Sequence, residues 1–283
     1  MPEGNSKAFS KDSIKDERFE KAAERRIFMI TCGDVMDFLQ ELAPAELAED
    51  WDNTGLMTGS RKRKVSRILV SLDPTADALN KAAEIRADLL VTHHSLVFKG
   101  LKRVTDDDIV ESRVCTAISK GISVISAHTN LDYADSGVNA QLASVLGLSN
   151  LEMLGHGPGR VGLLKEKLGL ETFINHVKAS LGISHVRVVG NAGAGIMKVA
   201  VFSGSFDDDL EAVKRSCVDV VVTGELKHHT ALDAREAGMC FVVASHFSTE
   251  RIVVPYLASA IAGKFPAVDV VCFEQETDPF ITY

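Results

Sequence analysis

Short apolar runs alternate along this chain with segments in which apolar residues recur at helical spacing. Residues 66–73, 88–93 and 122–128 are short apolar runs rich in β-branched residues, which is typical of buried strands. Between them, residues 75–87 and 107–121 have the spacing of helices with one apolar face. Strands that alternate with helices indicate right-handed βαβ units and a largely parallel sheet.

The same alternation returns in the second half of the chain. Helices are predicted at 138–148, 171–182, 207–216, 227–238 and 248–263, and strands at 185–190, 197–204, 219–225, 240–246 and 267–275. The glycine-rich stretch at 155–164 is typical of a linker, although such a run could also cradle a phosphate. The pattern therefore predicts an α/β fold of two similar lobes, with mostly parallel sheets flanked by helices and a cleft between the lobes.

The predicted boundaries follow from these elements. Residues 1–29 are polar and predict a flexible extension, residues 30–150 form the first lobe, and residues 155–248 form the second. Residues 249–283 could join either lobe, the first included. Because only about ten residues join the two lobes, no third domain is expected between them.

Composition and charge narrow the classes of function. The chain has 283 residues, of which 46% are hydrophobic and 25% charged, as expected for a globular protein with a packed core. Its formal net charge of −8 disfavours direct binding to nucleic acid. The polar N-terminus and the lack of an 18-residue apolar run predict a cytoplasmic protein without a membrane span. The five cysteines form no CxxC pattern, so neither a disulfide framework nor a cysteine zinc site is expected.

Residues able to bind metals or move protons gather where the predicted strands end. Ligands of parallel α/β sheets bind outside the carboxyl ends of the strands. The residues that follow four strand ends are His93 and His94; His128 and Asp132; Glu225, His228 and His229; and His246 and Glu250. Histidine and carboxylate together suit zinc, iron or manganese, and more than four candidate ligands favour two ions over one. Two such ions would lower the pKa of a bound water and leave a hydroxide nucleophile near neutral pH.

Each of these residues also has a simpler structural interpretation. Asp132 could form a turn with its neighbours, and Glu250 could be an acidic residue in the first turn of a helix. His228 and His229 could be the exposed first turn of their helix. Only the shared position at strand ends favours a common site.

The adjacent pair His93 and His94 makes the sharpest prediction. Neighbouring side chains of a strand point to opposite faces, so the two rings should reach two different metal ions. Glu250 and Asp132 would then complete the two sites from other strand ends. A structure in which both rings turn into an apolar core would contradict this hypothesis.

Five ordered motifs resemble a known family. They are WDNTGL (51–56), VTHHSLVFKG (91–100), SAHTNLDYADSGVNAQLASVLGL (126–148), TGELKHHTALDA (223–234) and ASHFSTER (244–251). Together they resemble the GTP cyclohydrolase I type 2 family of Nif-three-like, dinuclear metal-binding proteins. The match extends over nearly the whole chain from about residue 30.

The resemblance implies two divalent metal ions in the cleft between two lobes, and a ring-shaped homohexamer. It implies that the metal ligands are His93, His94, Asp132, His246 and Glu250, with Glu250 as the bridge. His128 would lie among or beside these ligands, and His128 and Glu225 are the candidate catalytic residues. Trp51, Asp52 and Asn53 would line the cleft, although Trp51 could instead be a packing anchor, and Glu225, His228 and His229 would lie on the substrate side.

One residue departs from the pattern of the family. In the turn "SGSFDDDL" (203–210), Phe206 stands where the family usually has glycine. Because only glycine adopts positive φ freely, this departure puts the backbone geometry of the turn in doubt.

The resemblance implies a metal-dependent hydrolase whose substrate is a nucleotide or a related phosphorylated small molecule. The alternative is a metal-binding regulatory or scaffold protein that contacts transcription-related proteins without catalysis, and metal storage or delivery is a third hypothesis. Histidine and carboxylate ligands leave the identity of the metal open.

Overall fold

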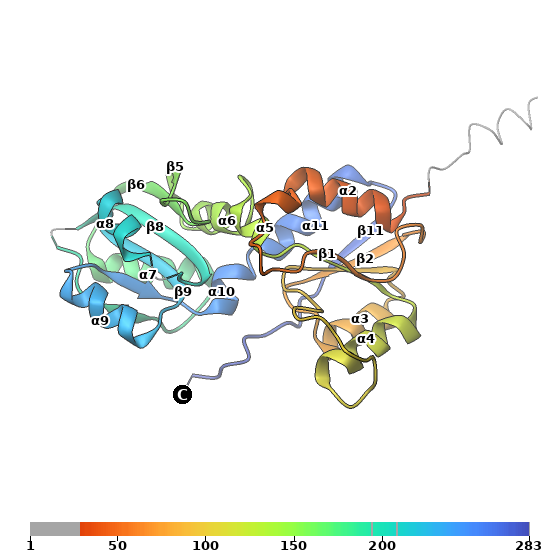
Figure 1. Ribbon diagram of the computed structural model, residues 1–283. Helices are drawn as coiled ribbons and strands as arrows, with labels where there is room; N and C mark the ends of the chain where they lie inside the picture. The colour runs from red at the N-terminus through yellow and green to blue at the C-terminus, as the bar shows by residue number, and fades with distance from the viewer. Residues whose placement is uncertain (1–28, 194, 208, 283) are drawn as a thin grey trace, which may run out of the picture.

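The computed structural model describes residues 29–282 except residues 194 and 208, and it shows two α/β lobes side by side (Figure 1). The predicted two-lobed α/β class is confirmed. The predicted N-terminal extension lies outside the described residues, apart from Met29. Across the described residues, no helix combines the length and the apolar character that a membrane span requires.

The first lobe contains a five-stranded sheet in the order β1-β4-β3-β2-β11. Its strands are β1 (Gly55–Thr58), β2 (Arg67–Ser71), β3 (Leu89–Thr92), β4 (Ser123–Ser126) and β11 (Asp269–Cys272). Only β1 runs antiparallel to its neighbour, so β2, β3, β4 and β11 end at the same edge of the sheet.

Helices cover both faces of this sheet. They are α2 (Cys32–Leu42), α3 (Ala76–Glu84), α4 (Ile109–Lys120) and α11 (Val253–Lys264), and a 3-10 turn, η1 (Ala45–Leu47), follows α2. Ile68 and Val70 of β2 pack into the core formed with α2 and α11, whereas Leu69 packs into the core formed with α3 and α4. The continuous apolar runs of the sequence arise because these strands are buried on both faces.

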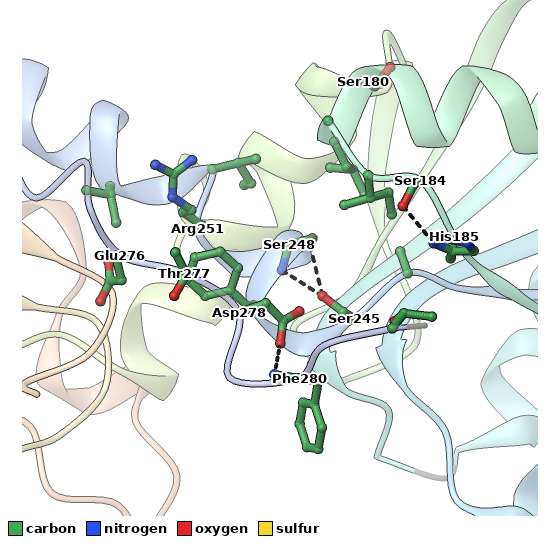
Figure 2. Close-up of a pocket in the computed structure, with 18 of the residues that line it drawn as sticks. Ser180, Ser184, His185, Ser245, Ser248, Arg251, Glu276, Thr277, Asp278 and Phe280 are labelled. Atoms are coloured by element: carbon green, nitrogen blue, oxygen red, sulfur yellow. Dashed lines mark hydrogen bonds between the residues drawn. The ribbon is translucent and has the colours of Figure 1, made fainter.

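The C-terminal part of the chain returns to the first lobe. Strand β11 pairs in parallel with β2, with Asp269 opposite Arg67. Residues after β11 then run between the lobes beside a cavity of about 1040 Å3 (Figure 2). In the close-up, Glu276 lies toward the first lobe and Phe280 lies below Ser245.

The second lobe contains a six-stranded sheet in the order β5-β6-β8-β9-β10-β7. Its strands are β5 (Ser149–Met153), β6 (Arg160–Leu168), β7 (Arg187–Val189), β8 (Ile196–Ser205), β9 (Val220–Glu225) and β10 (Phe241–Val243). Only β8, β9 and β10 are parallel to one another, so this sheet is mixed rather than mostly parallel. Its helices are α7 (Leu170–Leu181), α8 (Leu210–Ser216) and α9 (His228–Glu236).

The glycine-rich stretch at 155–164 is not simply a linker. Its first residues turn the chain between β5 and β6, and strand β6 already begins at Arg160. A Cβ atom at Gly162 would lie 2.8 Å from the Leu151 side chain and 2.9 Å from Cβ of Leu148. The glycine therefore permits close packing within the sheet. Because glycines are also typical of loops, the sequence alone makes this segment look like a loop.

Three short helices lie where the lobes meet (Figure 1): α5 (Thr129–Tyr133), α6 (Val138–Val145) and α10 (His246–Glu250). Helix α6 joins the two cores, because Val138 packs into the first lobe and Leu142 into the second. The single helix predicted at 248–263 is in fact two, α10 and α11, separated by a turn at Arg251 and Ile252. This break lets α10 leave the second sheet and α11 enter the first lobe.

Phe206 does not disturb the turn in which it stands. The left-handed conformation is adopted by Gly204, with φ of +61°. The Phe206 ring is 2% exposed and lies edge-on to Phe202 and Phe241, with ring centroids 5.3 Å away in each case. Phe206 is therefore a core residue of the second lobe.

We expect the substitution Phe206→Ala to lower the free energy of unfolding by about 3–5 kcal/mol, because it removes a buried ring and leaves a cavity. Chemical denaturation of the metal-free protein measures this change. Ile118→Ala, at a side chain that is 60% exposed, is the control and should change the stability by less than about 0.5 kcal/mol. A loss below about 1 kcal/mol for Phe206→Ala would contradict the packing described here.

Candidate metal centre

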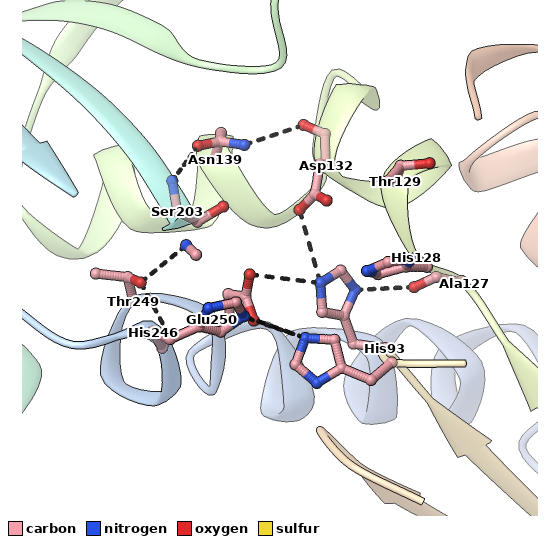
Figure 3. A network of polar contacts seen from close by, with 12 residues as sticks. His93, Ala127, His128, Thr129, Asp132, Asn139, Ser203, His246, Thr249 and Glu250 are labelled. Carbon is pink, nitrogen blue, oxygen red and sulfur yellow. Dashed lines mark hydrogen bonds and ion pairs between the residues drawn. The ribbon is translucent and has the colours of Figure 1, made fainter. Parts of the chain in front are cut away.

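Six side chains converge where the carboxyl ends of the parallel strands of both sheets face each other (Figure 3). His93 and His94 follow β3, His128 follows β4, and Asp132 lies on α5; His246 and Glu250 lie on α10, which follows β10. They form three overlapping groups, and within each group the ligand atoms lie within 4.8 Å of one another. The groups are His93, His94 and His128; His94, His246 and Glu250; and His93, Asp132 and Glu250.

His93 is fully buried, and the backbone fixes its ring. Its Nδ1 donates a hydrogen bond to the carbonyl of Ala127, at 2.9 Å. A proton therefore lies on Nδ1, and Nε2 faces the cluster. That Nε2 lies 3.7 Å from Oδ1 of Asp132 and 3.9 Å from Oε1 of Glu250.

His94 is oriented by a carboxylate. Its Nδ1 donates to Oδ1 of Asp73 at 2.8 Å, which directs Nε2 toward the second lobe. There, Nε2 lies 3.0 Å from Oε2 of Glu250 and 3.4 Å from Nε2 of His246. A carboxylate behind a histidine, fixing its tautomer and raising its basicity, is a frequent arrangement at metal sites.

His128 has the same kind of support. Its Nδ1 donates to Oδ1 of Asp52 at 2.7 Å. The other oxygen of Asp52 accepts from the backbone N–H of Thr129 at 3.0 Å and from its hydroxyl at 2.6 Å. The three histidines of the first lobe thus all use Nδ1 as a donor and leave Nε2 to the cluster.

The geometry of these atoms suits a metal ion better than it suits hydrogen bonding among themselves. His93 Nε2 and Asp132 Oδ1 are buried and lack a hydrogen-bond partner among the described residues. His246 Nε2 lies 2.9 Å from Glu250 Oε2, so two ring nitrogens and one carboxylate oxygen meet at a single point. Ligand bonds of about 2.0–2.1 Å at tetrahedral angles would place neighbouring ligand atoms about 3.3 Å apart, close to these separations. The donor set of imidazole and carboxylate suits zinc, iron or manganese.

The adjacent histidines share one group with His128, and each also belongs to a second group without the other. His93 joins Asp132 and Glu250, whereas His94 joins His246 and Glu250, and Glu250 belongs to both. Neither ring turns into an apolar core. This is the arrangement expected if the two rings reach separate ions, although the number of ions bound stays a prediction.

The end of β8 holds Glu250 closely. A Cβ atom at Gly204 would lie 2.1 Å from Oε1 of Glu250. The backbone N–H of Gly204 donates to the hydroxyl of Thr249 at 3.1 Å. The backbone of the second lobe therefore presses against the shared carboxylate, and any larger residue at position 204 would displace it.

In the metal-free protein, the charged side chains of the centre strongly shift one another's pKa values. Burial would lower the pKa of His94, but its hydrogen bonds to Asp73 and Glu250 raise that pKa to about 10. Burial would raise the pKa of Glu250, but the neighbouring rings of His246, His93 and His94 hold it well below its usual value. For Asp132 burial prevails and raises the pKa to about 7. Such opposed shifts in one cluster are typical of functional sites.

The other predicted cleft residues differ in how close they come. Glu225 lies at the end of β9, with an oxygen 3.6 Å from Nδ1 of His246. His228 and His229 are exposed at the start of α9, outside the three groups. Trp51 is 60% exposed and lies edge-on to Phe98 and His128, so it is not a core packing anchor.

Asn53 and Asp73 complete the surroundings of the site. Asn53 donates from its side-chain amide to the carbonyl of Val97, in the loop after β3, and its own carbonyl accepts from Ser95. Asp73, which orients His94, was not among the site residues predicted from the sequence. It lies just after the end of β2, so the strand-end rule could have identified it.

We expect metal binding to release protons, because His94 must lose its Nε2 proton to become a ligand. With a pKa of about 10, His94 is protonated at neutral pH in the metal-free protein, so metal affinity should rise with pH across the neutral range. Titrating the metal-free protein with Zn2+ in buffers of different ionisation enthalpy measures the protons released, and at least about one per chain is expected near pH 7. A heat of binding that does not depend on the buffer would contradict the protonation described here.

Comparisons with known proteins identify the family of this chain. The family model described as Duf34/NIF3 (NGG1p interacting factor 3) matches residues 30–279. A Clostridium perfringens protein named GTP cyclohydrolase 1 type 2 homolog is 30% identical over 255 residues, covering 87% of this chain and 97% of the relative. A Streptomyces coelicolor protein of the same name is 34% identical over 229 residues, covering 77% of this chain and 80% of the relative.

Solved structures give the same result. The crystal structure of a hypothetical protein of Staphylococcus aureus aligns with a TM-score of 0.84 at 28% identity, covering 90% of this chain and 99% of that chain. Reduced HcgD from Methanocaldococcus jannaschii aligns with a TM-score of 0.74 at 27% identity, covering 86% of this chain and 98% of that chain. The resemblance inferred from the five sequence motifs is confirmed. The chain therefore belongs to the Duf34/NIF3 family, and the curated relatives described above are named GTP cyclohydrolase 1 type 2 homologs.

Proposed function

We propose that the protein is a hydrolase that uses two divalent metal ions to act on a nucleotide or a related phosphorylated small molecule. One observation carries the proposal: two groups of ligand atoms, from buried and half-buried side chains, share Glu250, the residue that would bridge the ions. The names of the curated relatives support the nucleotide, and zinc, iron and manganese all suit the ligands. Bound at this centre, such ions would lower the pKa of water and supply a nucleophile near neutral pH.

His128 is the candidate for proton transfer. Burial lowers its pKa, and the neighbouring His93 adds to this, while the hydrogen bond to Asp52 opposes them. The net lowering favours a neutral ring with a free lone pair on Nε2 at neutral pH, as a general base requires. Asp52 fixes the ring and would stabilise the imidazolium formed when His128 accepts a proton.

A cavity of about 670 Å3 beside the centre offers room for the substrate. Its lining includes His246 and Glu225 together with Arg187, Lys227 and Phe280. Small-molecule sites usually have about 300–1,000 Å3 and combine apolar walls with a few polar groups. A phosphorylated compound in this cavity would extend from the cationic side chains to the metal centre, with Glu225 facing its reacting end.

The description of the family supports a second candidate function. Its name, NGG1p interacting factor 3, refers to a protein interaction, which suits a metal-binding regulatory or scaffold protein. We propose in either case a cytoplasmic homo-oligomer, a ring-shaped hexamer, that does not bind membranes or nucleic acid directly. The edge strand β5, whose residues are all exposed and include Leu151 and Met153, is a surface that subunit contacts would cover.

We expect the protein, once loaded with Zn2+ or Mn2+, to hydrolyse GTP or another phosphorylated compound in a panel of nucleotides and phosphoesters. The substitution His94→Ala should lower the rate at least about 100-fold, because it removes a ligand of one ion. His156→Ala, at an exposed position in the loop between β5 and β6 and outside the cluster, is the matched control and should retain the activity. Elemental analysis of each variant should accompany the rates.

His128→Ala separates the two roles possible for that residue. It should lower the rate about 100-fold or more while both ions stay bound, as expected for a general base. Loss of an ion would instead make His128 a ligand. The hydrolase proposal fails if the protein with two ions bound turns over nothing in the panel, or if His94→Ala acts as fast as the parent.

A further inference from the structure

The segment that follows the last strand carries one buried carboxylate. Glu276 is 8% exposed, whereas Glu274, Gln275 and Thr277 around it are exposed. Figure 2 shows Glu276 at the first-lobe end of this segment. A buried carboxylate needs hydrogen-bond partners that compensate for its loss of hydration, so the contacts of Glu276 indicate its role.

Both carboxylate oxygens of Glu276 are used at the end of strand β2. Oε2 accepts from the backbone N–H of Leu72 at 2.8 Å, and Oε1 accepts from the backbone N–H of Asp73 at 2.7 Å. Along the chain, Glu276 is more than 200 positions away from these two residues. The carboxylate thus holds the backbone of Asp73 at the point where β2 ends.

The next contact leads into the metal centre. Oδ1 of Asp73 accepts from Nδ1 of His94 at 2.8 Å, and Nε2 of His94 lies 3.0 Å from the shared carboxylate of Glu250. The backbone N–H of His94 also donates to the carbonyl of Leu72, at 3.0 Å. Glu276 therefore holds the two residues that fix the backbone and the ring of His94.

A second carboxylate so close to Asp73 is unfavourable by itself. Burial raises the pKa of Glu276 and the charge of Asp73 raises it further, while the two backbone N–H groups oppose these effects. A neutral amide would avoid this repulsion, but it has a single acceptor oxygen and would leave one of the two backbone N–H groups facing an NH2 donor. A carboxylate instead adds negative charge behind Asp73, and so strengthens the hold on the proton at Nδ1 of His94.

We propose that Glu276 is a positioning residue of the metal centre, which sets Asp73 and, through it, the ring of His94. The C-terminal segment is then part of the site, although it supplies no ligand. This inference rests on metal binding at the proposed centre and does not require hydrolysis. Residues that support metal ligands from behind commonly change metal affinity about 10–100-fold when they are replaced.

The test is a calorimetric titration of the metal-free protein with Zn2+. Glu276→Gln, which keeps the size of the side chain, should weaken by about 10-fold the binding step that His94→Ala abolishes. The other step, which depends on His93 and Asp132, should change by less than about twofold. Glu274→Gln, at an exposed carboxylate of the same segment, is the control and should bind both ions as the parent does.

A double-mutant cycle shows whether the effect passes through Asp73. If it does, Glu276→Gln added to Asp73→Asn should weaken the His94 step by less than about twofold beyond Asp73→Asn alone, because coupled residues are not additive. Unchanged Zn2+ binding by Glu276→Gln, or additive losses in the double variant, would overturn the proposal. Equal weakening of both steps with a lower unfolding midpoint in urea would also overturn it, since Glu276 would then only fasten the segment. None of these readouts uses turnover, so a failure of the hydrolase proposal would not be mistaken for a failure of this one.

Discussion

The structure depends on a set of buried polar side chains that converge on one point with too few hydrogen bonds to satisfy them. His93 Nε2 and Asp132 Oδ1 have no hydrogen-bond partner among the described residues, and Glu250 Oε2 is approached by ring nitrogens of both His246 and His94, at 2.9 and 3.0 Å. An unpaired buried polar atom costs about 1–3 kcal/mol, and more when it is charged. His93 donates from Nδ1 to Ala127 and His94 donates from Nδ1 to Asp73, so neither ring can turn without losing that hydrogen bond. Divalent ions would supply the missing partners of these atoms. The rest of the fold is the frame that holds the side chains in place.

That frame comes from two sheets whose parallel strands end at the same place. The first lobe supplies His93, His94 and His128 from strand ends, and α10 brings His246 and Glu250 from the second lobe. Helix α6 fixes the two lobes relative to each other by packing into both cores. Asn139 of α6 strengthens this link: its amide donates to the carbonyl of Asp132 at 3.3 Å and its oxygen accepts from the N–H of Ser203 at 2.8 Å. The distance between the ligand sets is therefore set by packing and hydrogen bonds outside the centre.

The alternation of apolar strands with amphipathic helices predicted the fold class, and the strand-end rule pointed to the residues that meet at the centre, because apolar runs followed by histidine or carboxylate are visible without coordinates. It missed Asp73, since an aspartate after a strand is equally typical of an ordinary turn. Glu276 is invisible in the sequence because its partners, Leu72 and Asp73, are brought near only by the pairing of β11 with β2. The start of strand β6 was interpreted as a linker because its glycines are typical of loops, whereas Gly162 in fact permits close packing within the sheet. Phe206 was suspected of straining a turn whose positive φ falls on Gly204. These errors share one cause: the role of each residue depends on contacts with residues distant in the sequence, which a local sequence pattern does not show.

The central claim is that His93 and His94 serve two separate ions that share Glu250. Anomalous diffraction at the zinc absorption edge, from crystals of the protein grown with Zn2+, tests it most directly. The account predicts two anomalous peaks about 3.5–4 Å apart, one beside His93 and Asp132 and one beside His94 and His246, with Glu250 between them. A single peak contacted by both rings, or no peak within reach of Glu250, would contradict it.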